Sequence, residues 1–120
     1  MCSPQSIPYP TLFGAKFLSL DASLVSNYSR YVREGYYLNH GAINVTNVSI
    51  AYTHPGQNDV VNVQAWLPLD TWNGRMQTVG GGGWMAGMFE LSYMEMSGAV
   101  GEGYVTITTD GGHSAANPKD

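Results

Sequence analysis

The sequence has 120 residues, of which 43% are hydrophobic and 12% are charged, a composition typical of one globular domain rather than a disordered chain. The five basic residues are scattered and the formal net charge is −4, so we expect no nucleic-acid partner. No apolar run approaches the roughly 18 to 20 residues that a membrane-spanning helix needs, so we expect no membrane partner either.

Residues 1–42 show no consistent hydrophobic period. Prolines near the start are followed by a mixed apolar segment and by several tyrosines. We predict an irregular N-terminal arm that lies across a surface, with tyrosine rings packed and their hydroxyls exposed to water. An aromatic platform that binds carbohydrate is the alternative for this arm.

Three N-x-[ST] sequons, at Asn27, Asn44 and Asn47, are crowded into one short stretch, which is typical of a glycosylated, secreted protein. The N-terminus, however, has neither the positive nor the apolar region of a signal peptide. The single cysteine, Cys2, has no partner within the chain, although secreted proteins usually carry an even number. We therefore interpret the sequence as part of a longer secreted protein whose signal peptide is not present here.

From residue 43 the pattern becomes regular. Residues 43–53 alternate and are rich in β-branched side chains, which predicts a strand. The turn formers HPGQND follow, so residues 60–67 should return as an antiparallel strand that ends before Pro68. We interpret His54, at the start of this turn, as a residue exposed to solvent.

The second half of the chain predicts a strand, a glycine run, a helix and a further strand. Residues 76–79 form a short apolar run that indicates a buried strand. The helix that follows has Ser92 as its expected N-cap, with Glu95 three positions on as a capping box, and it should stop at Gly101 or Gly103. We interpret the methionines in and before this helix as adaptable core residues.

Residues 104–108 then form the last predicted strand. Because a helix joins it to the strand at residues 76–79, these two strands should be parallel. Residues 43–120 are therefore predicted to be the opening part of an α/β fold.

The four consecutive glycines at residues 80–83 indicate a backbone that turns tightly or is closely approached. A flexible surface loop is one interpretation. Between a strand and a helix, such a loop directs backbone N–H groups either at phosphates or at the oxyanion of an esterase intermediate. Gly81, Gly83 and Ala86 satisfy the G-x-G-x-x-[GA] spacing of dinucleotide-binding loops. That fold places an acidic residue about 20 positions further on, but Asp110 lies 29 positions past Gly81, and here an antiparallel pair of strands precedes the loop. Both departures favour the oxyanion hypothesis.

The motifs WLPLDTWNGRMQTVGGGGWMAG and GYVTITTDGGHS resemble the tannase and feruloyl esterase family. The resemblance extends over roughly residues 43–114 and, more loosely, over the arm from Tyr9 to Asn39. It implies the N-terminal part of an α/β-hydrolase with an inserted lid, which hydrolyses ferulate-type or gallate-type esters, including plant cell-wall esters, through a Ser-His-Asp triad. The family places its nucleophile in a C-S-x-G-G motif, which is not in this sequence. Its calcium site belongs to the lid, so no metal or cofactor is expected in this chain.

The resemblance implies that Gly81, Gly82 and Gly83 form the oxyanion loop and that one of them donates its N–H. Asp110 and His113 correspond to the family's T-D-x-G-H turn and are expected to be structural, not members of the triad. None of the three triad residues has a counterpart here, so this chain alone is expected to be inactive.

The chain departs from the family at one place, and the resemblance gives one further expectation. Fungal relatives tend to carry a cysteine in the first strand, where this chain has Val48 and Ser49. The strand at residues 76–79 should be an open edge through which the chain self-associates.

A secreted non-catalytic binding or structural module remains the rival hypothesis for the function of this chain, and a nucleotide-binding protein is the third hypothesis.

Overall fold

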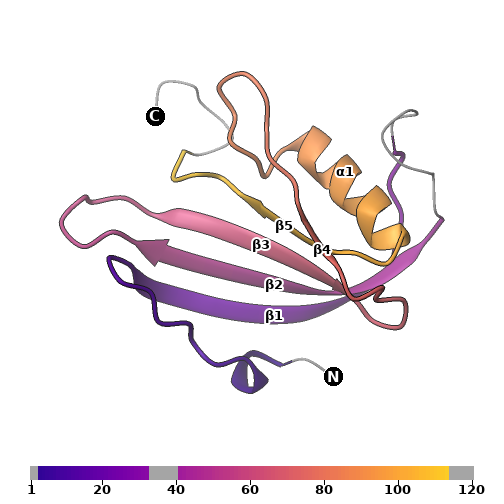
Figure 1. Ribbon diagram of the computed structural model, residues 1–120, viewed down its shortest axis with the longest axis horizontal. Coiled ribbons are helices and arrows are strands. Elements are labelled where there is room, and N and C mark those ends of the chain that lie inside the picture. The colour runs from indigo at the N-terminus through magenta and orange to yellow at the C-terminus, as the bar shows by residue number, and fades with distance from the viewer. Residues whose placement is uncertain (1–2, 33–40, 114–120) are drawn as a thin grey trace.

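The computed structural model describes residues 3–32 and 41–113, which form one mixed sheet with a helix against one of its faces (Figure 1). The elements in chain order are the 3₁₀ turn η1 (Pro4–Ser6), β1 (Lys16–Tyr28), β2 (Ile43–Thr53), β3 (Val61–Pro68), β4 (Met76–Thr78), α1 (Glu90–Gly101) and β5 (Val105–Thr109). Cys2 and Ser114 lie outside the described residues.

The strand order in the sheet is β1-β2-β3-β5-β4. The first three strands form an antiparallel meander, and β5 is antiparallel to β3. β4 and β5 are parallel, as the crossover through α1 requires, so this prediction is confirmed. β4 is the outermost strand on its side of the sheet, and its three residues are exposed or half-buried, with Met76 62% exposed. The expectation that residues 76–79 form a buried strand is therefore wrong for β4 and holds only for Val79, which is buried.

The prediction of an irregular arm is wrong for Lys16–Tyr28, which form the longest strand of the sheet. β1 pairs with β2 along its whole length, from Lys16 opposite Thr53 to Tyr28 opposite Ile43. Two register shifts interrupt the pairing, one near each end, and they break the alternation that identifies a strand. The side chains of β1 are exposed or only partly buried, as is usual for a strand at the edge of a sheet, which weakens its hydrophobic signal further.

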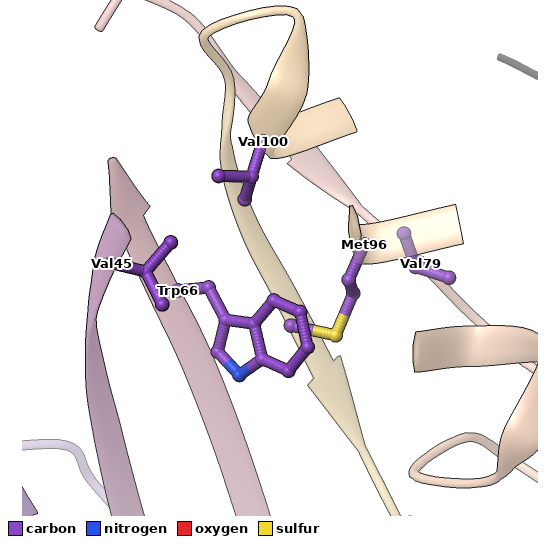
Figure 2. Packing of buried hydrophobic residues seen from close by; sticks show 5 residues of the cluster. All are labelled: Val45, Trp66, Val79, Met96 and Val100. Atoms are coloured by element: carbon purple, nitrogen blue, oxygen red, sulfur yellow. The ribbon is translucent and has the colours of Figure 1, made fainter. Parts of the chain in front are cut away.

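The core lies between the sheet and α1 and is built around Trp66, packed with Val45, Val79, Met96 and Val100 (Figure 2). Met96 is fully buried, as expected of a core methionine, and a buried side chain of this size contributes about 1.5–3 kcal/mol. Two tyrosines pack against the Trp66 indole, with ring centroids 5.2 Å away for Tyr28 and 5.9 Å away for Tyr93. Tyr28 is therefore committed to the core and not to a carbohydrate platform, whereas Tyr36 and Tyr37 lie outside the described residues.

The start of α1 differs from the prediction and its end agrees with it. The helix begins at Glu90 with Phe89 as its N-cap, so the capping box at Ser92 is wrong. Ser92 is fully buried inside the first turn and its hydroxyl donates to the Gly80 carbonyl at 3.1 Å. At the other end, Gly103 has φ +90° and its N–H donates to the Val100 carbonyl, which confirms the glycine stop.

Candidate functional site

The glycine loop connects β4 to α1 and begins in the sheet. The Val79 N–H still donates to the Ile107 carbonyl of β5 at 2.7 Å, so the chain enters the loop from a fixed position. Residues 82–85 then form a tight turn, in which the Met85 N–H donates to the Gly82 carbonyl at 3.2 Å and Gly83 has φ +63°. Trp84 is next in the turn, and its side chain is 87% exposed.

Gly81 is the position in this loop where a side chain cannot be accommodated. A Cβ there would lie 1.8 Å from the Met85 carbonyl oxygen and 2.7 Å from the carbonyl carbon of Ala86. At Gly82, by contrast, a Cβ would meet no atom within 4 Å. The glycine at position 81 therefore permits close contact between two backbone segments of the loop, which is one of the uses of glycine expected from the sequence.

Backbone N–H groups within the glycine run remain available. Among the described residues, the N–H groups of Gly81 and Gly83 meet no hydrogen-bond acceptor, whereas Gly82 forms an isolated bridge with Met85. The Gly80 carbonyl is occupied by the Ser92 hydroxyl, which fixes the first residue of the run. Unpaired backbone N–H groups in a fixed loop suit an anionic oxygen.

The helix that follows the loop argues against a phosphate site. In dinucleotide-binding folds the phosphates sit directly on a helix N-terminus. Here α1 starts seven residues after Gly83, and its first residue is the acidic Glu90. The Glu90 carboxylate, which pairs with the Arg30 guanidinium at 2.8 Å, already supplies a negative group at that end of the helix.

The second half of the loop is anchored on β5. A Cβ at Gly87 would lie 2.5 Å from both the Thr108 hydroxyl and the Thr109 carbonyl oxygen, so the two backbones are in close contact. The Met88 N–H donates to the Thr108 hydroxyl at 3.2 Å, and Met88 has φ +56°, which is uncommon for a residue other than glycine or asparagine. Thr108 is fully buried, so it is a rigid attachment point for the loop.

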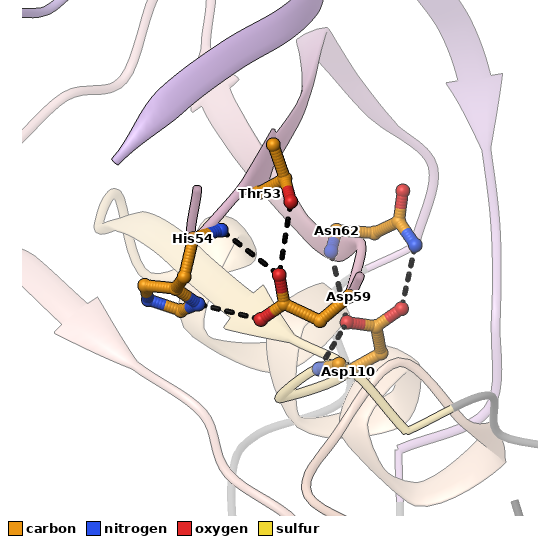
Figure 3. A network of polar contacts seen from close by, with 6 residues as sticks. Thr53, His54, Asp59, Asn62 and Asp110 are labelled. Atoms are coloured by element: carbon orange, nitrogen blue, oxygen red, sulfur yellow. Dashed lines mark hydrogen bonds and ion pairs between the residues drawn. The ribbon is translucent and has the colours of Figure 1, made fainter. Parts of the chain in front are cut away.

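Asp110 closes the turn that follows β5, and its carboxylate accepts hydrogen bonds from the residues around it (Figure 3). It accepts hydrogen bonds from the Asn62 N–H at 2.9 Å, the Asn62 side-chain amide at 2.6 Å and the Gly112 N–H at 2.9 Å. The Asp110 side chain is buried, and the His113 N–H donates to the Asp110 carbonyl at 3.0 Å. Asp110 therefore holds the end of β5 against the start of β3, and its contacts leave it poorly placed to act as a base.

A His–Asp pair that the sequence analysis missed spans the turn between β2 and β3 (Figure 3). His54 Nδ1 lies 2.5 Å from Asp59 Oδ2, and the other Asp59 oxygen accepts from the His54 N–H and the Thr53 hydroxyl. The hydrogen bonds from His54 lower the pKa of Asp59 from 3.8 to about 2. The signal available in the sequence was a histidine and an aspartate at the two ends of a Pro-Gly turn. His54 is exposed, as expected, but its ring is paired.

The two buried serines of α1 are not placed as nucleophiles. The Ser92 hydroxyl donates to Gly80, and the Ser97 hydroxyl donates to the Tyr93 carbonyl at 2.8 Å, one helical turn earlier. Both hydroxyls thus donate to backbone carbonyls, and neither is hydrogen-bonded to a histidine in the part of the chain that the structure describes. Of the three sequon asparagines, Asn27 and Asn44 are exposed and Asn47 is partly buried.

Within residues 3–32 and 41–113, no group of three or more His, Cys, Asp or Glu side chains could hold a metal ion. Over the same ranges, no helix is both long and apolar enough to cross a membrane.

Comparison with known proteins gives three results. Residues 43–120 match the family described as tannase and feruloyl esterase. A probable feruloyl esterase from Arthroderma benhamiae is 51% identical over 71 residues, which are 58% of this chain and 13% of that protein. The structure is similar to tannin acyl hydrolase from Aspergillus niger, with a TM-score of 0.73 and 30% identity, over 91% of this chain and 19% of that one. The chain thus spans less than a fifth of the length of either relative.

Proposed function

The chain belongs to the tannase and feruloyl esterase family, and on that premise we propose that it is part of a secreted carboxylic ester hydrolase acting on phenolic esters of the ferulate or gallate type. The glycine loop is its contribution to the active site. The observation that carries this proposal is the pair of unoccupied N–H groups at Gly81 and Gly83, in a loop anchored on both sides to the sheet.

The proposed reaction is acyl transfer to a serine supplied by another part of the enzyme. The serine oxygen attacks the ester carbonyl carbon and its proton passes to a histidine, so that the carbonyl oxygen becomes an oxyanion. An N–H of the glycine loop donates to this oxygen, together with the N–H of the residue after the serine. The alcohol then leaves with the proton from the histidine, and water releases the phenolic acid by the same steps.

The contacts within the loop narrow the choice of donor. Gly82 pairs with Met85 and the Met85 N–H closes the turn, so Gly81 and Gly83 are the better candidates. Removing one oxyanion donor typically raises the barrier by about 2.7–4 kcal/mol. The loop needs no large movement to act, because Thr108 and Ser92 hold its two ends.

The direct test is hydrolysis by the product of the complete gene. Purified enzyme is incubated with methyl ferulate, methyl gallate and an aliphatic methyl ester, and the released acid is measured by chromatography. We expect release of a phenolic acid, and stoichiometric inactivation by a serine-directed phosphonate. Failure to cleave either phenolic ester, or activity insensitive to the phosphonate, contradicts the proposal.

The 120-residue chain gives a matched control. It contains no C-S-x-G-G motif, and the described serines of α1 are bonded to backbone carbonyls. We therefore expect the purified chain to release no phenolic acid under the same conditions. Measurable turnover by the pure chain, titratable with the phosphonate, would show that the nucleophile lies within these residues.

A further inference from the structure

The three sequons lie in three different environments, although they are close together in the sequence. Asn27 is in the last part of β1, whereas Asn44 and Asn47 are both in β2. The register of the sheet shifts between Val25 and Tyr28, so Asn27 stands in an irregular part of the strand pairing. Asn27 has φ +57°, a left-handed conformation, and its side chain is exposed.

The side chain of Asn27 is available for modification. Its carboxamide makes no hydrogen bond to any other described residue, whereas its backbone N–H donates to the Asn44 side-chain oxygen. A bulge directs a side chain away from the regular face of the sheet. The serine of the same sequon, Ser29, is also exposed, as the chain leaves β1.

Asn44 lies beside Asn27 but has a structural task. Its side-chain oxygen accepts the Asn27 N–H at 2.9 Å and so closes the gap that the register shift leaves in the ladder. The carboxamide of Asn44 is therefore fixed against the backbone of β1. A glycan on its nitrogen would begin next to the Asn27 side chain, so the two positions compete for the same space.

Asn47 faces the side of the sheet that α1 covers. Its side-chain oxygen is buried without a hydrogen-bond partner among the described residues, in a pocket of about 240 Å³ that Trp66 and Tyr93 also line. A glycan attached there would have to pass between the helix and β1. The native packing of Trp66 on Tyr93 therefore disfavours a sugar at Asn47.

We propose that Asn27 is the N-glycosylated residue among the three, and that Asn44 and Asn47 are unmodified in the folded protein. This inference rests on the secretion proposed above. Asn27 is near the C-terminal end of β1, at the end of the sheet where β2 and β5 begin, whereas Asp110 and the glycine loop lie at the other end of the strands. The glycan thus leaves the proposed active-site end uncovered.

The test is site mapping on the complete gene product secreted by a yeast. The protein is treated with peptide N-glycosidase in heavy-oxygen water, which converts each glycosylated asparagine to a labelled aspartate, and its peptides are sequenced by mass spectrometry. We expect the label at residue 27 and at neither 44 nor 47. Label at residue 44 or 47, or no label at residue 27, overturns the proposal.

Three variants remove one sequon each and keep every asparagine. Ser29→Ala should abolish the mobility shift that glycosidase treatment produces at this site, whereas Thr46→Val and Ser49→Ala should leave both the shift and the label at residue 27 unchanged. A label at residue 27 that survives Ser29→Ala contradicts the assignment. Ester hydrolysis in the same medium is a separate readout, because an inactive protein labelled at residue 27 contradicts only the proposed activity.

Discussion

The glycine loop and the Asp110 turn lie at the same end of the sheet and touch each other, but different interactions fix their backbones. A Cβ at Gly111 of the turn would lie 2.9 Å from the Ala86 Cβ of the loop. In the turn, one carboxylate accepts three hydrogen bonds. In the loop, the absence of side chains lets the backbone of Gly81 approach Met85 and Ala86.

This difference determines what each region can bind. A carboxylate that accepts several N–H groups uses up the donors around it, so the Asp110 turn offers little to a ligand. A loop held by close backbone contact keeps its N–H groups unused, at the conformational cost of consecutive glycines. The Asp110 turn is therefore rigid without free donors, whereas the glycine loop is rigid and keeps unpaired N–H donors.

The largest expected effect comes from placing a methyl group at the close contact. Gly81→Ala brings a Cβ to within 1.8 Å of the Met85 oxygen, so the loop must move. We expect the chain to lose about 3 kcal/mol of stability, as for severe overpacking. In the complete enzyme we expect a fall in kcat of about 100- to 1,000-fold if the displaced N–H is the oxyanion donor. Urea denaturation and ester hydrolysis measure the two effects.

Gly82→Ala is the matched control, because its methyl group enters open space and Gly82 has no positive φ. We expect less than about 1 kcal/mol of destabilisation, the cost of an ordinary surface change. Equal losses in the Gly81 and Gly82 variants would mean that the close contact at Gly81 does not shape the loop.

The next effect comes from removing the acceptor in the turn. Asp110→Ala leaves the Asn62 N–H, the Asn62 amide and the Gly112 N–H without their acceptor. We expect a loss of about 2–3 kcal/mol, because hydrogen bonds to a charged group are among the stronger ones. Asp110→Asn keeps an acceptor oxygen and should lose less. An alanine variant as stable as the wild type would show that these bonds contribute nothing net.

A smaller effect is expected at the link between helix and loop. Ser92→Ala removes the hydroxyl that donates to the Gly80 carbonyl. The loss should be about 1 kcal/mol, typical of one neutral hydrogen bond. Hydrogen exchange should rise at residues 80–83 and not in the Asp110 turn. Faster exchange in both regions would show that the two are one cooperative unit.

The smallest effect is expected at Asp59, in the turn between β2 and β3. Its pKa is lowered to about 2 in the folded chain, from an ordinary value of 3.8. The charged carboxylate therefore stabilises the fold above about pH 4, and this contribution disappears as the pH falls towards 2. The melting temperature of Asp59→Asn should lie below that of the wild type at neutral pH, with the gap closing below pH 4. A gap that is constant with pH would contradict the His54 pairing.

The regular strands were predictable because their signals are local. Residues 43–53 alternate without interruption and form β2 over that range. The parallel pairing of β4 and β5 followed from the handedness of a helical crossover. β1 was not identified because its two register shifts and its exposure on both faces remove the alternation of apolar and polar residues that identifies a strand in a sequence.

The details of the site were less predictable, because they depend on contacts between distant residues. Ser92 carries a capping signal, yet its hydroxyl bonds to Gly80 across the fold. The pairing of His54 with Asp59 requires the closed turn. Gly81 and Gly82 are neighbouring glycines that the sequence cannot tell apart, whereas in the structure only Gly81 lies against the backbone of Met85 and Ala86. The family motifs locate the loop, and the packing determines which N–H groups remain unpaired.

The three tryptophans make these regions separately visible by fluorescence. Trp66 is 7% exposed in the core, whereas Trp72 and Trp84 are 63% and 87% exposed. Acrylamide in solution quenches the exposed indoles and leaves the buried one emitting at shorter wavelength. Trp84 adjoins Gly83, so a spectral change that acrylamide removes reports on the loop or on the connection between β3 and β4. A change that persists in acrylamide reports on the packing of the sheet against α1.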